Sequence, residues 1–360
     1  MKIVILGPKN SIHLCRWANS LYDFGHEVYV ISCHKGIGEL NPNIKGYDLL
    51  FNPPLGYFFN YIQLKKLIKK ISPDILHVHY ASGYGLLGAF SKFSPQFLSV
   101  WGSDVNSFPY KNLFNKMIII HNLKCADFIC ATSKSLAESV IKLNKDFANK
   151  IEIIPFGIDI HKFKKIKRKK IDQMFTIGTV KSLEKIYGID ILIDGFNEFL
   201  KKINRMQNKK STFKLKIIGS GSLNNSLKKK CKKLKLESEI EFIEKVNHRQ
   251  VPGMLNSIDI YVAMSREESF GVSVLEASAC EIPVIVSEVG GLPEVVVNNK
   301  TGFIIKNEDA KSLADKIYHL YCSSKLRIEM GANGRSFVKS NYKWEDSVKK
   351  LHTLYYKAVR

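Results

Sequence analysis

Short apolar runs alternate with helical patterns along almost the whole chain, and this alternation restricts the fold more than any other feature. In the first half, the predicted strands are Ile3–Leu6, Glu27–Ser32, Ile75–His79, Phe97–Val100, Phe128–Ala131 and Ile151–Pro155. Runs this short and β-branched are typical of buried parallel strands, which need crossover helices such as the one predicted for His13–Phe24. The sequence therefore predicts an α/β protein with a doubly wound sheet.

The alternation starts again in the second half of the chain. Its predicted strands are Phe175–Gly178, Leu215–Ile218, Glu241–Ile243, Ile258–Met264, Pro283–Val286 and Gly302–Ile305. A chain of 360 residues suits two domains, each able to bury a core of its own. The basic stretch HKFKKIKRKKI, residues 161–171, indicates a solvated linker. We therefore expect one domain at 1–162, a second at 163–342 and a last helix at about 343–360.

Residues 255–287, LNSIDIYVAMSREESFGVSVLEASACEIPVIVS, are predicted to form a strand, a polar loop, a helix and a second strand. The helix would begin near Gly271, so the backbone N–H groups of Gly271, Val272 and Ser273 would be free of partners within the helix. Free N–H groups and the helix dipole favour an anion, most naturally a phosphate. We expect this helix start to be the centre of the functional site.

Two carboxylates flank the predicted phosphate site, Glu268 before the helix and Glu276 within it. Negative side chains beside a phosphate need partners of their own, and sugar hydroxyls suit them. One carboxylate would take a ribose diol and the other a second sugar. The alternative is that Glu268 caps the helix and Glu276 is a solvated helix residue.

The stretch from Glu268 to Ile285 is similar to the signature of the retaining glycosyltransferases of family 4, a Glu-x7-Glu frame written E-x-F-G-x-x-x-L-E-A-x-A-x-x-x-P-V-I. Glu281 stands where the family usually has Gly. The resemblance implies the GT-B fold, with two Rossmann-like domains facing a cleft. It also implies that the first domain binds the acceptor, the second binds a nucleotide sugar, and the last helix packs back on the first.

The resemblance also implies a set of donor-binding residues. The loop GSGS matches the family's G-x-G loop near the nucleotide, and Val246-Asn247-His248 matches the segment that holds the base through main-chain atoms. Residues 270–272 match those around the diphosphate and donor sugar. The predicted donor set is Gly219, Gly221, Val246, Asn247, Phe270, Gly271, Val272, Ser273 and Glu276.

A leaving diphosphate needs its growing negative charge neutralised. The chain has no convincing DxD pair, so we expect no metal and no cofactor beyond the nucleotide sugar. The nearest cations are Lys181 and Lys185 in GTVKSLEKIYG. Family members commonly have Arg and Lys where this chain has Thr179 and Tyr187. The predicted catalytic residues are Glu268, Lys181, Lys185 and Asp104; the alternative is that both lysines are ordinary surface residues.

The acceptor side is predicted in loops that follow strands of the first half, with candidates Gly7, His13, Trp101, Asp104 and Asn106. In WGSD, Trp101 stands where many relatives have a His, which leaves Asp104 as the nearest general base. The leaving phosphate itself is another proton acceptor, so a protein base is not required. His77 and His79 are expected to be core or loop histidines.

The charge balance is strongly basic, with 55 Lys and Arg against 33 Asp and Glu, a net charge of +22. Nucleic-acid binding, an anionic membrane surface and codon bias towards Lys each explain it, but no nucleic-acid-binding motif supports the first. The apolar run LLFNPPLGYFFNYI, residues 49–62, either packs in the core or dips into lipid. Seven cysteines without a CxxC pair, and no signal-peptide pattern, favour a cytoplasmic, peripheral protein.

Together these features predict a metal-independent retaining glycosyltransferase that uses a nucleotide-diphosphate sugar, with UDP favoured and GDP as the alternative. The acceptor would be a glycan or a polyprenol-linked molecule in the synthesis of surface polysaccharide, lipopolysaccharide or other glycolipid. The competing hypothesis is a noncatalytic protein on the same scaffold that binds a nucleotide sugar or nucleic acid. The donor sugar, the acceptor and the oligomeric state stay open.

Overall fold

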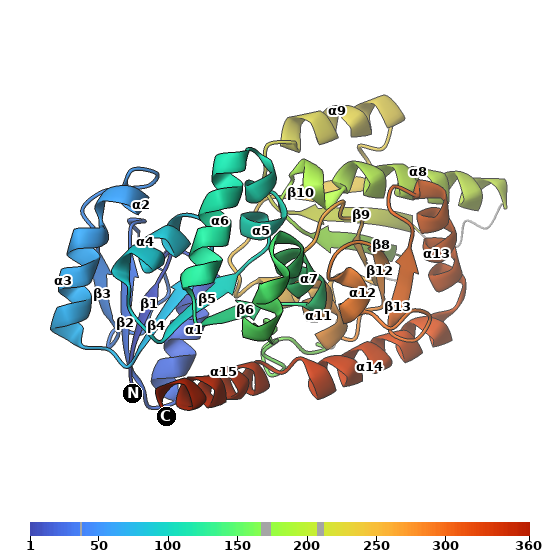
Figure 1. Cartoon of the computed structure of the whole chain (residues 1–360). Helices are drawn as coiled ribbons and strands as arrows, with labels where there is room; N and C mark the ends of the chain where they lie inside the picture. Colours follow the sequence, from blue (N-terminus) through green and yellow to red (C-terminus); the bar gives the residue numbers. More distant parts are fainter. Residues whose placement is uncertain (37, 167–173, 207–211) are drawn as a thin grey trace. The chain divides into compact units, whose positions relative to one another are not determined.

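The computed structural model describes residues 1–36, 38–166, 174–206 and 212–360. The chain divides into two compact units, unit 1 with Met1–Pro155 and Glu345–Arg360, and unit 2 with Phe156–Trp344. Each unit is built on a parallel sheet with helices around it (Figure 1), which confirms the predicted fold class. The first break follows Pro155 rather than residue 162, because Ile158 and Phe163 are buried in unit 2.

In the described part of unit 1, the sheet has seven parallel strands in the order β3-β2-β1-β4-β5-β6-β7. They are β1 (Lys2–Leu6), β2 (Glu27–Ser32), β3 (Lys45–Asp48), β4 (Ile75–His79), β5 (Gln96–Val100), β6 (Phe128–Ala131) and β7 (Ile151–Ile153). The strand order reverses between β1 and β4. In open α/β sheets, ligands bind beyond the carboxyl ends of the strands at such a reversal.

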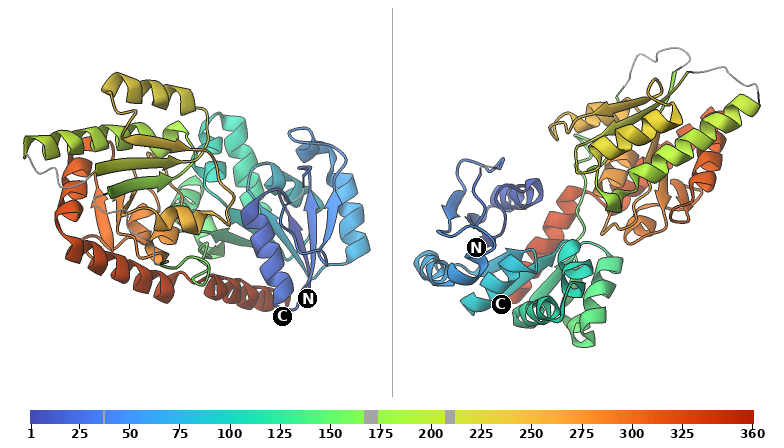
Figure 2. Two further views of the ribbon diagram at one scale, coloured as in Figure 1. Left: turned by 180° about the vertical axis from the view of Figure 1, so that it is seen from behind. Right: turned by 90° about the horizontal axis from the view of Figure 1, so that it is seen from above.

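The helices of unit 1 cover both faces of its sheet (Figure 2). They are α1 (Ile12–Asp23), α2 (Gly56–Phe59), α3 (Tyr61–Ile71), α4 (Gly83–Ser91), α5 (Ser103–Asn106), η1 (Phe108–Tyr110), α6 (Leu113–Cys125), α7 (Lys134–Leu143), η2 (Lys145–Lys150) and, from residue 345 on, α15 (Trp344–Val359). Side chains of β4 alternate between the two faces. Leu76 and Val78 join a core with α3, α4 and α6, whereas His77 contacts Tyr355 of α15.

Strand β3 was not predicted from the sequence. Its residues, KGYD, are polar and mostly exposed, and it pairs only with β2 at the edge of the sheet. An edge strand needs no apolar alternation, because main-chain hydrogen bonds to one neighbour are enough to hold it. The pattern that revealed the buried strands is therefore absent here.

In the described part of unit 2, the sheet has six parallel strands in the order β10-β9-β8-β11-β12-β13. They are β8 (Met174–Val180), β9 (Thr212–Ile218), β10 (Ile240–Ile243), β11 (Ile260–Ala263), β12 (Val284–Ser287) and β13 (Gly302–Ile305). Here the order reverses between β8 and β11. The loops after these two strands, residues 181–188 and 264–271, therefore meet at the place where a ligand is expected.

The helices of unit 2 are η3 (Lys185–Tyr187), α8 (Ile189–Arg205), α9 (Asn224–Leu234), α10 (Val251–Asn256), α11 (Val272–Ala279), α12 (Leu292–Val295), α13 (Ala310–Cys322) and α14 (Ser324–Asn341). Phe196 and Phe199 of α8 are fully buried against the sheet, in a core that also contains Ile317 of α13. Of the predicted basic linker 161–171, residues 161–166 belong to unit 2, and 167–171 lie outside the described residues.

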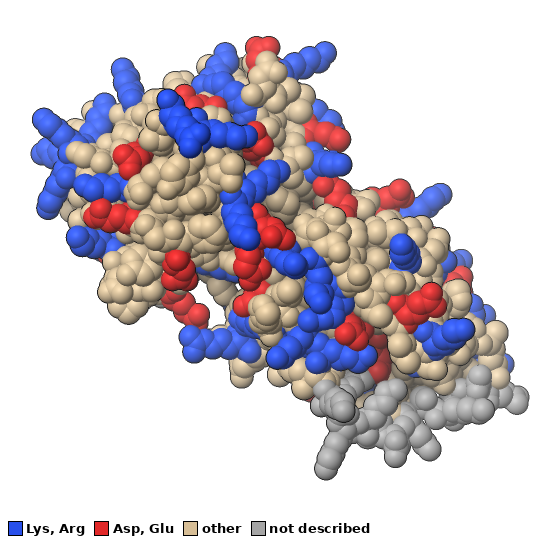
Figure 3. Space-filling view, turned by 90° about the horizontal axis from the view of Figure 1, so that it is seen from below, with Lys and Arg blue, Asp and Glu red and all other residues tan. Residues whose placement is uncertain are grey.

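The basic side chains do not gather in one patch on the face shown in Figure 3. Lys and Arg side chains are scattered over this face among uncharged residues, with Asp and Glu between them. Within the described residues, no helix is both long and apolar enough to span a lipid bilayer.

Candidate functional site

The predicted anion site lies at the start of α11, beyond the carboxyl edge of the unit 2 sheet. Gly271 precedes the helix with a φ of 105°, in the left-handed region that favours glycine. A Cβ at Gly271 would lie 2.9 Å from the side chain of Leu292. Val272 and Ser273 form the first turn and are half-buried. Their backbone N–H groups have no acceptor within the helix, so the turn is suited to hold a phosphate.

The loop that leads into α11 is held from two sides. Phe270 is buried, and its ring packs edge-on against Tyr342 with 5.6 Å between centroids. The backbone N–H of Gly291 donates to the carbonyl of Glu268 at 3.0 Å. The GGLPE segment, residues 290–294, therefore supports the backbone that carries Glu268.

Lys181 and Glu268 form an ion pair at the point where the loops after β8 and β11 meet. The Lys181 ammonium donates to Oε2 of Glu268, and the two side chains keep only 10% and 13% of their surface exposed. Ser265 Oγ donates to the same carboxylate at 3.2 Å. Burial alone would lower the pKa of Lys181, but the neighbouring carboxylate raises it above its ordinary value. Two of the predicted catalytic residues are thus in direct contact, and Lys181 carries a positive charge beside α11.

The ring of Tyr187 covers the other side of the Lys181 ammonium, with 4.8 Å from Nζ to the ring centroid. Burial raises the pKa of Tyr187, although Lys181 opposes that shift. Thr179 is fully buried. The two positions where the family commonly has basic residues therefore hold a cation–π partner and a core residue in this chain.

Lys185 lies in the short helix η3, which Arg266 ties to the loop after β11. Arg266 Nη1 donates to the carbonyl of Lys185 at 2.8 Å, and both Nη atoms bond the carboxylate of Asp190 at 2.9 and 2.8 Å. Arg266 Nε also donates to Glu308 at 2.7 Å. Hydrogen bonding to Asp190 raises the pKa of Arg266 and lowers that of Asp190. The backbone of Lys185 is thus fixed, while the predicted contact of its ammonium with a diphosphate stays a prediction.

The glycine loop after β9 packs against the segment that carries Lys181. Gly219 has a φ of 151°, and a Cβ there would lie 1.9 Å from the Lys181 carbonyl oxygen. The N–H of Leu183 donates to the Ser220 carbonyl at 3.0 Å, and Gly221 lies directly against Leu183. Both predicted donor glycines therefore allow a close approach of two loops. Any part that they have in nucleotide binding stays a prediction.

Glu276 is buried and bonds a histidine, which contradicts the alternative of a solvated helix residue. His248 Nε2 lies 3.0 Å from Glu276 Oε1, and His248 Nδ1 lies 2.8 Å from Lys162 Nζ. Because Lys162 is a donor at Nδ1, the proton of a neutral His248 lies on Nε2 and points to Glu276. The preceding residues Val246 and Asn247 lie in the loop after β10, where Asn247 Oδ1 accepts the N–H of Arg249 at 3.0 Å.

In unit 1, three of the predicted acceptor residues lie at the strand-order reversal. Gly7 follows β1 and donates its N–H to the Ile31 carbonyl at 3.0 Å. Trp101 follows β5, and the His13 ring meets it edge-on with 6.1 Å between centroids. The ring of His79, at the end of β4, lies 5.7 Å from the same indole. The structure thus brings His13 and Trp101 together, with His79 as a neighbour.

Asp104 is fully buried, and its carboxylate accepts backbone hydrogen bonds. Oδ2 accepts the N–H of Ala81 at 2.8 Å, and Oδ1 accepts those of Gly102 at 2.8 Å and Trp101 at 3.1 Å. Burial raises the pKa of this carboxyl, although the backbone N–H groups oppose the shift. A carboxylate occupied in this way joins the loops after β4 and β5. This placement favours a positioning role over the predicted roles of base and acceptor ligand.

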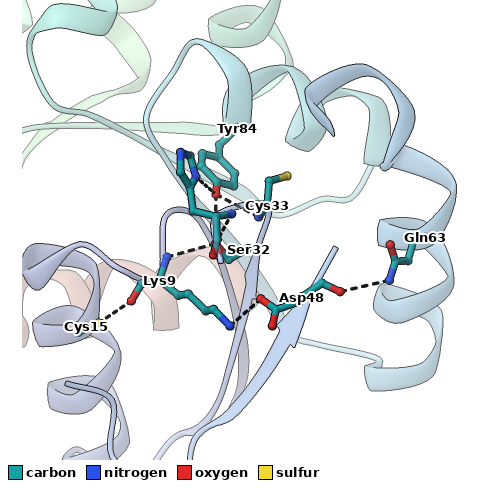
Figure 4. Close-up of polar contacts among 8 residues, drawn as sticks. Lys9, Cys15, Ser32, Cys33, Asp48, Gln63 and Tyr84 are labelled. Atoms are coloured by element: carbon teal, nitrogen blue, oxygen red, sulfur yellow. Dashed lines mark hydrogen bonds and ion pairs between the residues drawn. The ribbon is translucent and has the colours of Figure 1, made fainter. Parts of the chain in front are cut away.

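The loop between β1 and α1, which precedes His13, is tied to the neighbouring strands by a polar network (Figure 4). Lys9 Nζ pairs with Asp48 at 2.6 Å, and the Lys9 N–H donates to Ser32 Oγ at 3.2 Å. Ser32 Oγ also lies 3.1 Å from the hydroxyl of Tyr84 in α4. The network joins the ends of β1, β2 and β3 to the helix after β4. It therefore holds the backbone of the predicted acceptor loop in place.

Sequence reasoning missed several residues that build this site, namely Ser265, Arg266, Asp190, Tyr187 as a partner of Lys181, and His248 as a partner of Glu276. Most of their side chains pair with side chains far along the chain, and such pairing leaves no local pattern. Ser265 and Arg266 had a signal, because they lie in the polar loop between β11 and α11. Among the described residues, no cluster of His, Cys, Asp and Glu is arranged to hold a metal ion.

Two family models match this chain. The model described as "Glycosyl transferases group 1" matches residues 161–337. The model described as "Glycosyl transferase 4-like" matches residues 2–133. The matched stretches include the helix start at Gly271 in the second half and the loops around Trp101 in the first.

Similar proteins include two bacterial enzymes and one crystal structure. N-acetyl-alpha-D-glucosaminyl L-malate synthase of Bacillus anthracis is 26% identical over 94% of this chain and 91% of its own length. The capsular polysaccharide biosynthesis glycosyltransferase CapM of Staphylococcus aureus is 30% identical over 64% of this chain and 62% of its own. Anabaena HepE in complex with UDP and glucose has a TM-score of 0.82 at 17% identity, over 98% of this chain and 99% of that one. At that identity, the likeness shows the fold alone.

Proposed function

Because this chain belongs to the family-4 glycosyltransferases of the GT-B fold, we propose that it transfers a sugar with retention of configuration from a nucleotide-diphosphate donor. Membership of the family makes it a glycosyltransferase of glycoconjugate biosynthesis. The proposed donor is a UDP-sugar, with a GDP-sugar as the alternative. The proposed acceptor is a glycan or a lipid-linked molecule for surface polysaccharide or glycolipid, which the protein would meet on the inner face of the cell membrane.

One observation carries this proposal: the buried Lys181–Glu268 pair lies between the loops that meet at the start of α11. A cation next to the N-terminus of a helix can bind the negative charge of a diphosphate. A carboxylate in the same position can accept hydrogen bonds from sugar hydroxyls. Glu276 in α11 adds a second buried carboxylate, already bonded to His248. A protein that only bound a phosphate would gain nothing from two buried acids at this position.

The proposed reaction needs no base from the protein. The acceptor hydroxyl oxygen forms a bond to the anomeric carbon on the face that the diphosphate leaves, as the bond from that carbon to the phosphate oxygen breaks. The phosphate oxygen takes the hydroxyl proton. Lys181 and the first-turn N–H groups of α11 offset the charge that grows on the leaving diphosphate. No metal enters the proposal.

One structural neighbour supports a UDP-sugar over other donors. Anabaena HepE was crystallised with UDP and glucose, and also with UDP-glucose. Other relatives in Mycobacterium tuberculosis are named as GDP-mannose-dependent. The donor base is therefore proposed from similarity, and a direct comparison of UDP- and GDP-sugars decides it.

The test is donor-dependent release of UDP or GDP with a panel of glycan and polyprenyl-phosphate acceptors, with and without EDTA. We expect turnover with one donor, an unchanged rate in EDTA and a product with the donor's anomeric configuration by NMR. Glu268→Gln and Lys181→Met should each lower kcat/KM about ten- to a hundredfold, the loss of one charge-assisted hydrogen bond. Saturable binding of nucleotide sugar without turnover, or tight salt-sensitive binding of DNA, would favour the noncatalytic hypothesis.

A further inference from the structure

Large apolar side chains are exposed in two neighbouring segments of unit 1. Of the twenty such side chains exposed in the described part of the chain, eleven lie in residues 50–62 and 110–117. We call these eleven residues the apolar rim: Leu50, Phe51, Leu55, Phe58, Phe59, Tyr61, Ile62, Tyr110, Leu113, Phe114 and Met117. Leu113 is 74% exposed and Leu50 is 72% exposed. Water-exposed apolar groups at this density mark an interaction surface.

The two segments of the apolar rim are held close to each other by α4. Tyr61 of α3 packs edge-on against Phe90 of α4, with 6.0 Å between ring centroids. On the other side, Asn122 of α6 donates to the carbonyls of Ala81 and Ser82 just before α4, at 2.8 and 3.0 Å. Figure 1 shows α3, α4 and α6 along one side of the unit 1 sheet. The two segments of the apolar rim therefore lie in one unit, and the helices that carry them pack against the same helix.

The backbone beneath the apolar rim is fixed by polar side chains, so its apolar groups are held outward. Asn60 accepts the N–H of Phe51 at 3.0 Å and donates to the Phe51 carbonyl at 2.7 Å. Gln63 accepts the N–H of Leu50 at 2.8 Å. Asn112 caps α6 by accepting the N–H of Asn115 at 2.8 Å. The sequence alternative that residues 49–62 pack in the core is wrong for most of the segment, although Leu49 itself is buried.

Within the two segments that carry the apolar rim, the charged side chains are all positive. Residues 49–73 contain Lys65, Lys66, Lys69 and Lys70 and no acidic residue, and residues 105–126 contain Lys111, Lys116 and Lys124 and no acidic residue. The four lysines of α3 are exposed. A second copy of the chain would bring like charges together, which disfavours a dimer through this surface. A surface that joins apolar groups to a one-sided positive charge fits a bilayer that contains anionic lipid.

We propose that the apolar rim and the lysines of α3 seat unit 1 on an anionic lipid bilayer. The apolar side chains enter the lipid surface, and the lysines meet the headgroups. The rim segments belong to the helices that follow β4 and β5 and to their neighbours, near Trp101, whose indole contacts His13 of α1, so that a lipid-linked acceptor would reach Trp101 and His13 without leaving the bilayer. That last step rests on the proposed function, whereas seating on the bilayer does not.

The test is co-sedimentation of the full-length protein with vesicles of neutral phosphatidylcholine, alone or with a third of phosphatidylglycerol, at low and high salt. We expect binding to the anionic vesicles and release by salt. Leu113→Ser/Phe114→Ser/Met117→Ser and Leu55→Ser/Phe58→Ser/Phe59→Ser should each weaken binding at least tenfold, and so should replacing the four α3 lysines by Gln. Circular dichroism of each variant checks that it is folded.

Matched controls lie in unit 2. Ile328→Ser removes an apolar side chain that is 64% exposed outside the apolar rim, and a fourfold Lys→Gln variant of α9 at Lys228, Lys229, Lys232 and Lys233 removes the same charge. Both should bind vesicles like the wild type. Equal binding by the rim variants, loss of binding only in the α9 variant, or a rim-dependent dimer by light scattering would each overturn the proposal. Because the assay contains no donor, its failure is separate from a failure of donor-dependent UDP release.

Discussion

The Lys181–Glu268 pair consists of two charges that are costly to bury. It lies where a positive charge would stabilise the proposed diphosphate. Each side chain is about nine-tenths buried, so each would be destabilising without the other. Ser265 and the Tyr187 ring supply further partners to the two charges. In the proposed reaction, a donor diphosphate at the start of α11 would meet a Lys181 ammonium that Glu268 already holds in place and keeps ionised. Little reorganisation is then needed as negative charge develops.

This arrangement predicts a strong coupling between the two residues in stability. Lys181→Met leaves the Glu268 carboxylate mostly buried without its cation, and should lower the free energy of unfolding by about 3 kcal/mol. The double variant Lys181→Met/Glu268→Gln removes both charges and should recover most of that loss, while donor turnover stays low. Urea denaturation of the wild type, both single variants and the double variant measures the coupling. Additive losses would contradict a paired, buried interaction.

The free energy of unfolding should decrease at acid pH because of His79, whose ring is buried at the end of β4. Burial lowers the pKa of His79 to about 3, whereas an unfolded histidine has a pKa of about 6.5. The unfolded chain therefore binds the proton first as the pH falls. The stability from this residue is complete above about pH 6.5 and is lost as the pH falls towards 3, by up to about 1.4 kcal/mol per pH unit.

The variant His79→Leu removes this titration, because it replaces the imidazole by an apolar side chain of similar size. We expect its urea midpoint to fall less steeply than that of the wild type between pH 7 and pH 5. Fluorescence of Trp17 and Trp101 in a Trp344→Phe background reports unfolding of unit 1 alone. His77 is also buried with a lowered pKa, so a part of the slope should remain. Identical pH profiles for the two proteins would contradict the assignment to His79.

At the scale of elements, apolar periodicity predicted the strands and helices that face a core, often to within two residues. The helix predicted for His13–Phe24 is α1 at Ile12–Asp23, and the strand predicted for Gly302–Ile305 is β13. The polar edge strand β3 had no such pattern. The helix start at Gly271 was predictable because glycine at a strand–helix junction is a local signal. The His248–Glu276 contact was not, since it joins residues on separate elements.

The start of α11 gives a prediction about backbone shape. Gly271→Ala places a Cβ on a residue with a φ of 105° and 2.9 Å from Leu292, so it should cost about 1–3 kcal/mol of stability. It should also raise KM for the donor, because the first turn of the helix must shift. Gly253→Ala in α10 is the matched control, since a Cβ there meets nothing within 4 Å. The control should leave donor KM unchanged; an equal rise in both variants would show that the geometry at Gly271 is not special.

At the scale of the whole molecule, the end of the chain belongs to the unit in which the chain begins. Residues 345–360 lie in unit 1, although they follow all of unit 2 in the sequence. Val348, Leu351 and Tyr355 of α15 are buried, and Tyr355 bonds His77 of β4. The sequence predicted a last helix at about 343–360, but it did not show which residues this helix packs against. Only the resemblance to a family indicated that it returns to the first domain, because long-range pairing has no period to detect.

Removal of α15 should therefore unfold the unit at the other end of the chain. A chain that stops at Trp344 loses the burial of Val348, Leu351, Leu354 and Tyr355, at about 1.5–3 kcal/mol for each side chain. The sum is comparable to the whole stability of a typical domain, about 5–15 kcal/mol. Unit 2 keeps all of Phe156–Trp344, so its own core is intact.

Hydrogen exchange with mass spectrometry distinguishes the two units in one experiment. After truncation at Trp344, amides of β1 and β4 should exchange at nearly the unprotected rate, while those of β8 and β11 keep their protection. A second truncation that removes only residues 357–360, of which only Ala358 is partly covered, should leave both patterns unchanged. If β1 and β4 stay protected without α15, then the helix covers a core that is already stable, and the contact between Tyr355 and His77 adds little to the fold. If protection falls in both units at once, then the two units unfold cooperatively. In that case the two compact units that meet at Pro155 are not independently stable.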